Sequence, residues 1–257
     1  MELIDTHCHL TFKQLIGVLD AVIERSIAAG VTGWITVGTD SQQNRKVIEI
    51  TEKCENMYAA VGIHPHDAKT VTAETIRQLK ELAQNEKVVA VGEMGLDFHY
   101  NLSERPVQRR VFAAQLKIAA EMNLPVIIHS REAFDETMDI LEDFGSDVKK
   151  VVFHCFSYSP RQAKVALDRG YYISFTGVVT FKNADLARQS AKIVPTDRLM
   201  IETDCPYMSP EPMRKQKINE PALMIHTSER LARLKEMDLT DFAKAVTATS
   251  RTFFSLP

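Results

Sequence analysis

The sequence predicts an α/β protein in which 257 residues form one (β/α)8 (TIM) barrel. Short apolar runs rich in β-branched residues alternate with segments of helical periodicity. Eight such runs can be counted, and the chain length is normal for one barrel of this kind. Strands that alternate with amphipathic helices form parallel βαβ units. We therefore expect a single domain over residues 1–257.

The expected strands are, in order, Leu3–Asp5, Trp34–Val37, Tyr58–Val61, Val88–Gly92, Val126–Ile128, Val151–Phe153, Tyr172–Phe175 and Leu199–Thr203. The intervening segments carry apolar residues three and four apart, as at Phe112, Leu116 and Ala119. Gly30 and Gly170 stand where helices end just before a strand. The competing architecture is an open doubly wound sheet, but no glycine-rich phosphate-binding turn follows an early strand.

Composition narrows the class of protein. The net charge of −3 gives no global basic field of the kind that marks many nucleic-acid binders, although a local basic rim would suffice for binding. The four cysteines are far apart, which indicates reduced thiols in an intracellular protein. The chain has neither a signal-peptide pattern nor an apolar run of membrane-spanning length. We expect a cytoplasmic protein that does not enter the membrane.

Polar residues that can bind metals stand at the ends of the expected strands. His7 and His9 are two residues apart, so in a strand both side chains lie on the same face. Four other candidates directly follow an apolar strand, namely Glu93, His129, His154 and Asp204, and His64 comes three residues after the strand that ends at Val61. In barrels of this class the active site lies at the carboxyl ends of the strands. Buried polar groups without partners are costly, and a metal ion would satisfy them together.

We therefore expect six metal ligands: His7, His9, Glu93, His129, His154 and Asp204. His64 is expected to contact a ligand residue or the substrate rather than the metal. Asp97 either orients a ligand histidine through its second ring nitrogen or caps its segment. Arg131 either binds an anionic group or pairs with Asp135. In the long loop over 205–218, the basic run that begins at Arg214 either holds phosphates or is simply solvated.

Seven motifs in this sequence closely resemble the TatD family of metal-dependent deoxyribonucleases. They span nearly the whole chain in the order of the family and occupy residues 5–10, 62–66, 92–97, 129–131, 154–157, 202–207 and 219–221. The resemblance implies ligand roles for the six residues named above and two divalent cations. It also implies hydrolysis of DNA from a 3′ end by a cytoplasmic, typically monomeric enzyme.

The mechanism expected from these residues is hydrolysis of a phosphodiester bond by a metal-activated water, with Mg²⁺, Mn²⁺ or Zn²⁺ as the cations. Glu93 would bridge two metals, one held by His7 and His9 and the other by His129 and His154. Asp204 would complete the first metal site and act as general base.

The substrate of this 3′–5′ exodeoxyribonuclease would be single-stranded DNA, contacted by His64, Arg131 and Arg214. One alternative is a metal-dependent hydrolase of another ester or amide, such as a lactone, a phosphoester or an aminoacyl-tRNA ester. The other is a non-catalytic metal-binding scaffold.

Overall fold

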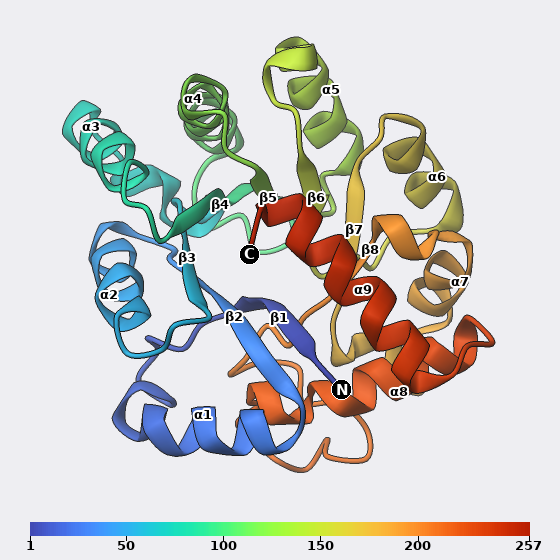
Figure 1. The fold of residues 1–257 in the computed structure, drawn as a ribbon. Helices are drawn as coiled ribbons and strands as arrows, with labels where there is room; N and C mark the ends of the chain where they lie inside the picture. The colour runs from blue at the N-terminus through green and yellow to red at the C-terminus, as the bar shows by residue number, and fades with distance from the viewer. The chain divides into compact units, whose positions relative to one another are not determined.

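The computed structural model describes residues 1–257 as parallel strands that alternate with helices (Figure 1). The eight strands form one sheet in chain order. Their bounds are β1 Leu3–Cys8, β2 Val31–Val37, β3 Met57–Val61, β4 Val88–Asp97, β5 Val126–Arg131, β6 Val151–Phe153, β7 Tyr172–Phe175 and β8 Leu199–Ile201. The predicted (β/α)8 class is confirmed.

Helices follow the strands throughout the chain. The α-helices are α1 Leu19–Ala28, α2 Ser41–Thr51, α3 Ala73–Leu82, α4 Arg105–Met122, α5 Phe134–Phe144, α6 Pro160–Asp168, α7 Asp185–Ile193, α8 Met224–Leu234 and α9 Leu239–Phe254. Short 3-10 helices include η2 Pro65–Thr70, η4 Gly177–Thr180 and η6 Pro221–Leu223. None of the helices has the length and apolar character needed to cross a membrane.

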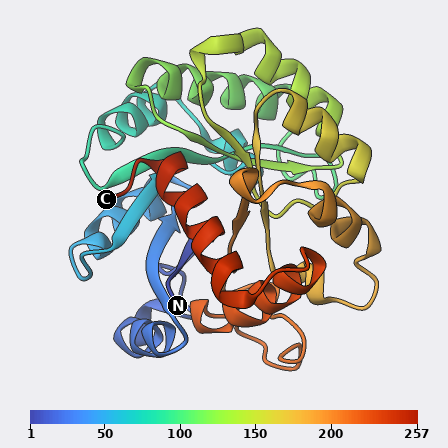
Figure 2. The ribbon, with the colours of Figure 1, turned by 45° about the vertical axis from the view of Figure 1, so that its right-hand side comes forward.

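Contacts group the chain into two compact units, residues 1–36 with 155–257 and residues 37–154. A single domain over residues 1–257 stays a prediction. In the first unit β1 pairs with β2 and β7 pairs with β8, all in parallel. Helix α9 packs against β1 and β8, and α8 lies beside α9 (Figure 2). The fully buried Trp34 of β2 donates its indole N–H to Ser26 of α1 at 2.9 Å.

In the second unit β3, β4, β5 and β6 pair in parallel, and helices α2 to α5 pack consecutively. Buried amide side chains from these helices hold the strand ends. Asn44 of α2 makes two hydrogen bonds with the backbone of Gly62, and Gln115 of α4 makes two with Ile63. These bonds satisfy backbone groups that would otherwise be buried without partners. They fix the turn that carries His64.

Three strands continue past the ends that the sequence patterns predict, whereas β8 ends at Ile201, before the predicted Thr203. β1 continues to Cys8, β4 to Asp97 and β5 to Arg131. His7, Glu93 and His129 therefore lie inside strands rather than just after them. The apolar run in each strand stops at the first polar candidate ligand, but the backbone ladder continues past it, and this explains the difference.

Candidate metal centre

Backbone pairing beyond β8 brings Asp204 to the two histidines of β1. The amide of Asp204 donates to the carbonyl of His7, and the amide of His9 donates to the carbonyl of Cys205, each at 2.9 Å. Asp204 has a positive φ of 53°, a conformation that aspartate tolerates better than most residues. The carboxylate is thereby placed against both imidazoles.

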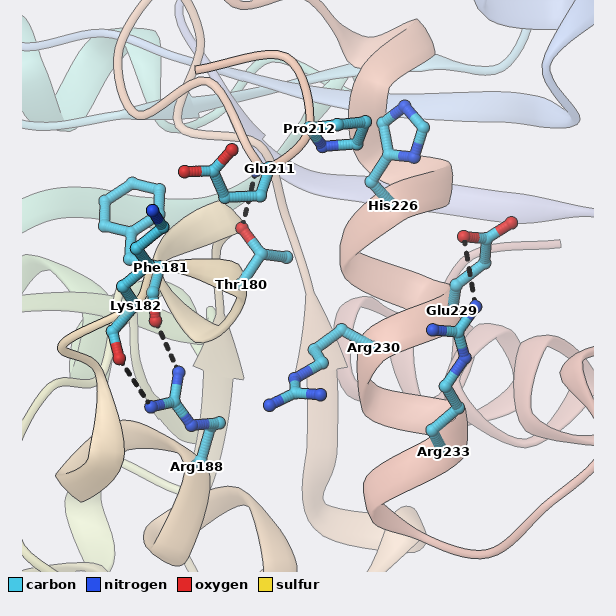
Figure 3. A pocket seen from close by; sticks show the side chains of 10 residues that line it. All are labelled: Thr180, Phe181, Lys182, Arg188, Glu211, Pro212, His226, Glu229, Arg230 and Arg233. Carbon is cyan, nitrogen blue, oxygen red and sulfur yellow. Dashed lines mark hydrogen bonds and ion pairs between the residues drawn. The ribbon is translucent and has the colours of Figure 1, made fainter.

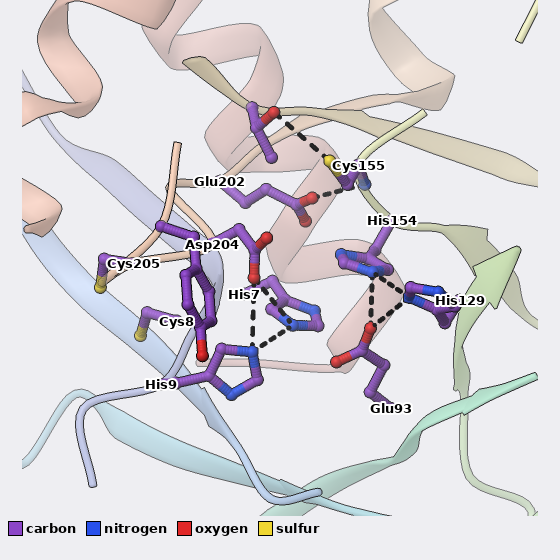
Figure 4. Close-up of polar contacts among 12 residues, drawn as sticks. His7, Cys8, His9, Glu93, His129, His154, Cys155, Glu202, Asp204 and Cys205 are labelled. Carbon is purple, nitrogen blue, oxygen red and sulfur yellow. Dashed lines mark hydrogen bonds and ion pairs between the residues drawn. The ribbon is translucent and has the colours of Figure 1, made fainter. Parts of the chain in front are cut away.

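We call His7, His9 and Asp204 the β1–β8 cluster, which Figure 4 shows joined by dashed contacts. The Nε2 atoms of the two histidines are 3.3 Å apart, and Asp204 Oδ1 lies 3.3 Å from His9 Nε2 and 3.8 Å from His7 Nε2. All three side chains are buried. The ring of His9 stacks on Phe12 at 4.6 Å between centroids, which fixes its plane.

The spacing of these donor atoms fits a divalent cation. A tetrahedral ion with bonds of about 2.0–2.1 Å holds its ligand atoms about 3.3–3.4 Å apart. Two imidazole nitrogens and one carboxylate oxygen are a common donor set for Zn²⁺, Mn²⁺ and related ions. The β1–β8 cluster therefore has the chemistry and the dimensions of a metal site.

Glu93 of β4, His129 of β5 and His154, which directly follows β6, form a second group, the β4–β6 cluster (Figure 4). Glu93 Oε1 lies 2.7 Å from both His129 Nδ1 and His154 Nε2. The two histidine nitrogens are 3.4 Å apart. Three donors on successive strands thus converge on one point. The two histidine nitrogens have the spacing of ligands on one cation, whereas Glu93 Oε1 lies at hydrogen-bond distance from each of them.

Asp97 holds the far side of the His129 ring. Its Oδ2 lies 3.1 Å from His129 Nε2 and 3.0 Å from His66 Nε2. Burial favours the neutral carboxyl, but the contacts with His129 and His66 outweigh it and hold the pKa of Asp97 well below its usual range. Burial also opposes a charge on His129, yet Asp97 and Glu93 raise the pKa of that ring. The structure shows both expected contacts of Asp97: Oδ2 faces His129, and Oδ1 caps the following turn by accepting a hydrogen bond from the amide of Tyr100 at 2.8 Å.

His64 stands close to the β4–β6 cluster. Its Nε2 lies 3.6 Å from Glu93 Oε1, and its ring meets that of His129 with centroids 4.5 Å apart. Burial lowers the pKa of His64 well below its ordinary value, although Glu93 opposes this shift, so the ring is neutral near pH 7. The Nδ1 atom accepts a hydrogen bond from the amide of His66. His64, Glu93 and His129 could also hold a metal together, so the exclusion of His64 from the ligands stays a prediction.

Two buried acids support the first unit and were absent from the set of expected site residues. Asp5 accepts hydrogen bonds from the amide and hydroxyl of Thr203 and from the amide of His7. Burial raises the pKa of Asp5 to about 7. Glu202 Oε1 accepts a hydrogen bond from the amide of Cys155. The sequence did contain a signal for these two acids. Asp5 stands two residues before the candidate ligand His7, and Glu202 stands two residues before the candidate ligand Asp204.

The two expected arginine contacts lie at exposed positions. Arg131 places its guanidinium over the ring of Tyr100, 4.7 Å from the centroid, and Tyr100 is itself 55% exposed. Arg214 lies over the ring of Phe181 at 3.9 Å. Both side chains are therefore positioned by an aromatic ring rather than by an acid.

The strand order and the two histidine–carboxylate clusters define the class: a (β/α)8 barrel of the metal-dependent hydrolase type. The family model described as TatD related DNase matches residues 4–255, so the chain belongs to the TatD family. It is a metal-dependent hydrolase of that family.

Relatives agree over the full chain. The sequence is 41% identical over 254 residues to "Uncharacterized metal-dependent hydrolase YabD" of Bacillus subtilis, with 99% of each chain covered. It is 34% identical over 256 residues to "3'-5' ssDNA/RNA exonuclease TatD" of Shigella flexneri, with 98% of each covered. The crystal structure of YJJV, a TatD homologue from Escherichia coli, superposes with a TM-score of 0.92 at 31% identity, covering 99% of this chain and 98% of that one.

Proposed function

We propose that this hydrolase is a 3′–5′ exonuclease that cleaves the phosphodiester bonds of single-stranded DNA. The observation that carries the proposal is the pair of histidine–carboxylate clusters, in which the paired imidazole nitrogens lie 3.3 and 3.4 Å apart, the spacing of two ligands on one divalent cation. Nitrogen-rich sites of this kind serve hydrolytic chemistry on ester bonds. The full-length similarity to an exonuclease named for single-stranded DNA and RNA supports the choice of substrate.

In this proposal His7, His9 and Asp204 hold one cation, and Glu93, His129 and His154 hold another. When bound, the cations supply Lewis acidity that acidifies a water molecule and offsets phosphate charge. Imidazole-rich donor sets favour Zn²⁺ or Mn²⁺, whereas phosphodiester substrates often bring Mg²⁺. The sharing of Glu93 between both cations stays a prediction.

The residues of the chain then have distinct tasks. Asp204 accepts the proton of the attacking water as general base, since its carboxylate is fixed by the backbone contact with His7 and is largely shielded from solvent. Asp97 would keep the proton of His129 on Nε2, which leaves the lone pair of Nδ1 for a bound cation. Glu93 supplies the carboxylate ligand of the β4–β6 cluster.

Substrate contacts are assigned to three side chains. His64 is neutral and buried, and it offers a hydrogen-bonding nitrogen beside the β4–β6 cluster. Arg131 and Arg214 are exposed and are held against aromatic rings, which suits them to flanking phosphates. A cytoplasmic location and a monomeric state stay predictions. All four cysteines are free thiols in the structure.

A substrate panel tests this function. The purified protein, loaded with Mg²⁺, Mn²⁺ or Zn²⁺, is assayed on end-labelled single-stranded DNA and RNA and, in parallel, on lactone, amide and phosphotriester substrates. We expect shortening of the DNA from its 3′ end and no comparable turnover of the small esters. If the protein instead hydrolyses a small ester and leaves the DNA intact, the proposed nuclease function is wrong and the protein is another hydrolase of the same family.

A further inference from the structure

A pocket lies in the first unit between helix α8 and the segment that follows β7 (Figure 3). Its volume is about 500 Å³. One wall is formed by Thr180, Phe181 and Lys182, and the opposite wall by His226 and Arg230 of α8. We call it the α8 pocket. None of its lining residues belongs to either metal cluster.

Two arginines of the α8 pocket are already engaged, and the lining also includes the acidic residues Glu211 and Glu229. Arg188 donates to the backbone carbonyls of Phe181 and Lys182 and pairs with Asp185. Arg233 pairs with Glu229 at 3.9 Å. These arginines stabilise the walls and leave little capacity for a ligand.

Arg230 is different from the other arginines of the pocket. Its Nε is shielded from solvent and has no hydrogen-bond acceptor on the protein. In Figure 3 its guanidinium leaves α8 and points across the pocket toward the wall that carries Arg188 and Phe181. A guanidinium that is partly buried without an acceptor costs free energy, and an anion that entered the pocket would remove that cost.

We propose that the α8 pocket binds the phosphate group of a nucleotide, with Arg230 as its main contact. The planar fork of a guanidinium matches the oxygens of a phosphate and holds two of them at once. Lys182 is exposed at the rim, and His226 lies one turn before Arg230 on the same face of α8. The volume exceeds what a bare oxyanion needs and falls in the range of sites for small organic ligands.

The basic loop next to this pocket favours a nucleic-acid source for the phosphate. Arg214 lies over the ring of Phe181, which also lines the α8 pocket. The run of basic residues over 214–217 therefore adjoins the pocket through one shared side chain. A strand held by that loop would carry its next phosphates toward Arg230. The strand source rests on the proposed exonuclease function, whereas binding of a free nucleotide does not.

Binding to chelator-treated protein separates the two sources without any hydrolysis. Calorimetry with inorganic phosphate and with deoxyadenosine 5′-monophosphate measures the free-ligand route. Fluorescence anisotropy of a labelled oligothymidylate of about 12 nucleotides, at several salt concentrations, measures the strand route. The variants are Arg230→Gln, Arg230→Lys and, as a matched charge control, Arg110→Gln on the exposed face of α4. Melting temperatures establish that each variant is folded.

We expect Arg230→Gln to lower the affinity for at least one probe about tenfold or more. Arg230→Lys should lower this affinity less, and Arg110→Gln should leave it unchanged. If Arg230→Gln lowers only the affinity for the oligonucleotide and makes that affinity less dependent on salt, the pocket binds a nucleic-acid strand. Loss confined to the monophosphate assigns it to a free nucleotide. Should Arg230→Gln fail to fold, Lys182→Gln at the exposed rim replaces it, with a smaller expected loss.

The proposal is overturned if wild-type protein binds none of the probes, or if Arg230→Gln and Arg110→Gln behave alike. Nuclease activity of the metal-loaded wild-type protein is measured separately. An inactive protein whose monophosphate binding depends on Arg230 would leave the α8 pocket in place and remove the proposed exonuclease. A protein that is active as an exonuclease, but whose binding of the probes does not depend on Arg230, would leave the proposed exonuclease in place and remove the α8 pocket as a binding site.

Discussion

His129 Nε2 lies 3.1 Å from Asp97 Oδ2, on the side of the ring opposite the contact between His129 Nδ1 and Glu93. The ring is thus held between two carboxylates, with Nδ1 facing the β4–β6 cluster and Nε2 facing Asp97. Asp97 is itself positioned by Gln108 of α4, whose side-chain oxygen accepts a hydrogen bond from the amide of Asp97 at 2.8 Å. The orientation of a candidate ligand therefore depends on a chain of buried hydrogen bonds that leads back to a helix.

Replacing Asp97 with asparagine should lower metal affinity without unfolding the protein. The amide keeps the size of the side chain but loses the charge that holds His129, and such changes typically cost about 10- to 100-fold in affinity. Competition with a chromogenic chelator measures the effect. Asp139→Asn, at an exposed position on α5, serves as the control. Equal affinities for both variants would show that Asp97 does not act through His129.

Replacing Asp204 with asparagine should abolish most of the hydrolysis even at saturating metal. Asparagine tolerates the positive φ of this position, so the fold should survive. Loss of a general base typically costs about 10²- to 10⁴-fold in rate. Turnover at increasing metal concentration separates weaker metal binding from a missing base. Turnover that returns to the wild-type rate at high metal would assign Asp204 only a ligand role.

Gly95→Ala should destabilise the protein markedly. Gly95 has a φ of 141°, and an added Cβ would lie 2.0 Å from the carbonyl oxygen of His129. Strain and collision together should lower the free energy of unfolding by at least about 1–3 kcal/mol. Urea denaturation of metal-free protein measures this. Gly170 also has a positive φ, but no atoms lie near its added Cβ, so Gly170→Ala measures the backbone strain alone. It should lower the free energy of unfolding less than Gly95→Ala does. A smaller loss in Gly95→Ala than in Gly170→Ala would contradict the close approach.

Glu93→Gln tests whether this carboxylate is shared between the cations. A shared ligand should weaken both binding steps in a metal titration, whereas His154→Asn should weaken only one. Isothermal titration of the metal-free protein with Mn²⁺ or Zn²⁺ resolves the two steps. One unchanged step in Glu93→Gln would confine Glu93 to the β4–β6 cluster.

The pairing of the two histidines in the β1–β8 cluster was accessible from the sequence because its signal is local. The i, i+2 spacing of His7 and His9 already places them on one face of a strand, and the structure has their Nε2 atoms 3.3 Å apart. Asp97 was also accessible in principle, since it stands four residues from Glu93 on the same strand and hence on the same face. The prediction left its role open because the apolar pattern of β4 stops at Glu93.

The α8 pocket could not be predicted from the sequence. In the sequence, His226 and Arg230 are ordinary positions on an amphipathic helix. The pocket exists only because α8 packs against the segment from Thr180 to Lys182, which comes some 45 positions earlier in the chain. Long-range packing of this kind leaves no periodic trace. The buried amides of Asn44 and Gln115 escape prediction for the same reason.

Metal content per chain tests the central claim most directly. Elemental analysis of wild-type protein, His9→Asn and His154→Asn, each equilibrated with Zn²⁺ or Mn²⁺ and freed of excess, counts the bound cations. We predict two per chain in the wild type and one in each variant, because each substitution removes a ligand from a different cluster. A wild-type protein that binds no cation, or variants that both retain the wild-type content, would contradict the assignment of one cation to each cluster.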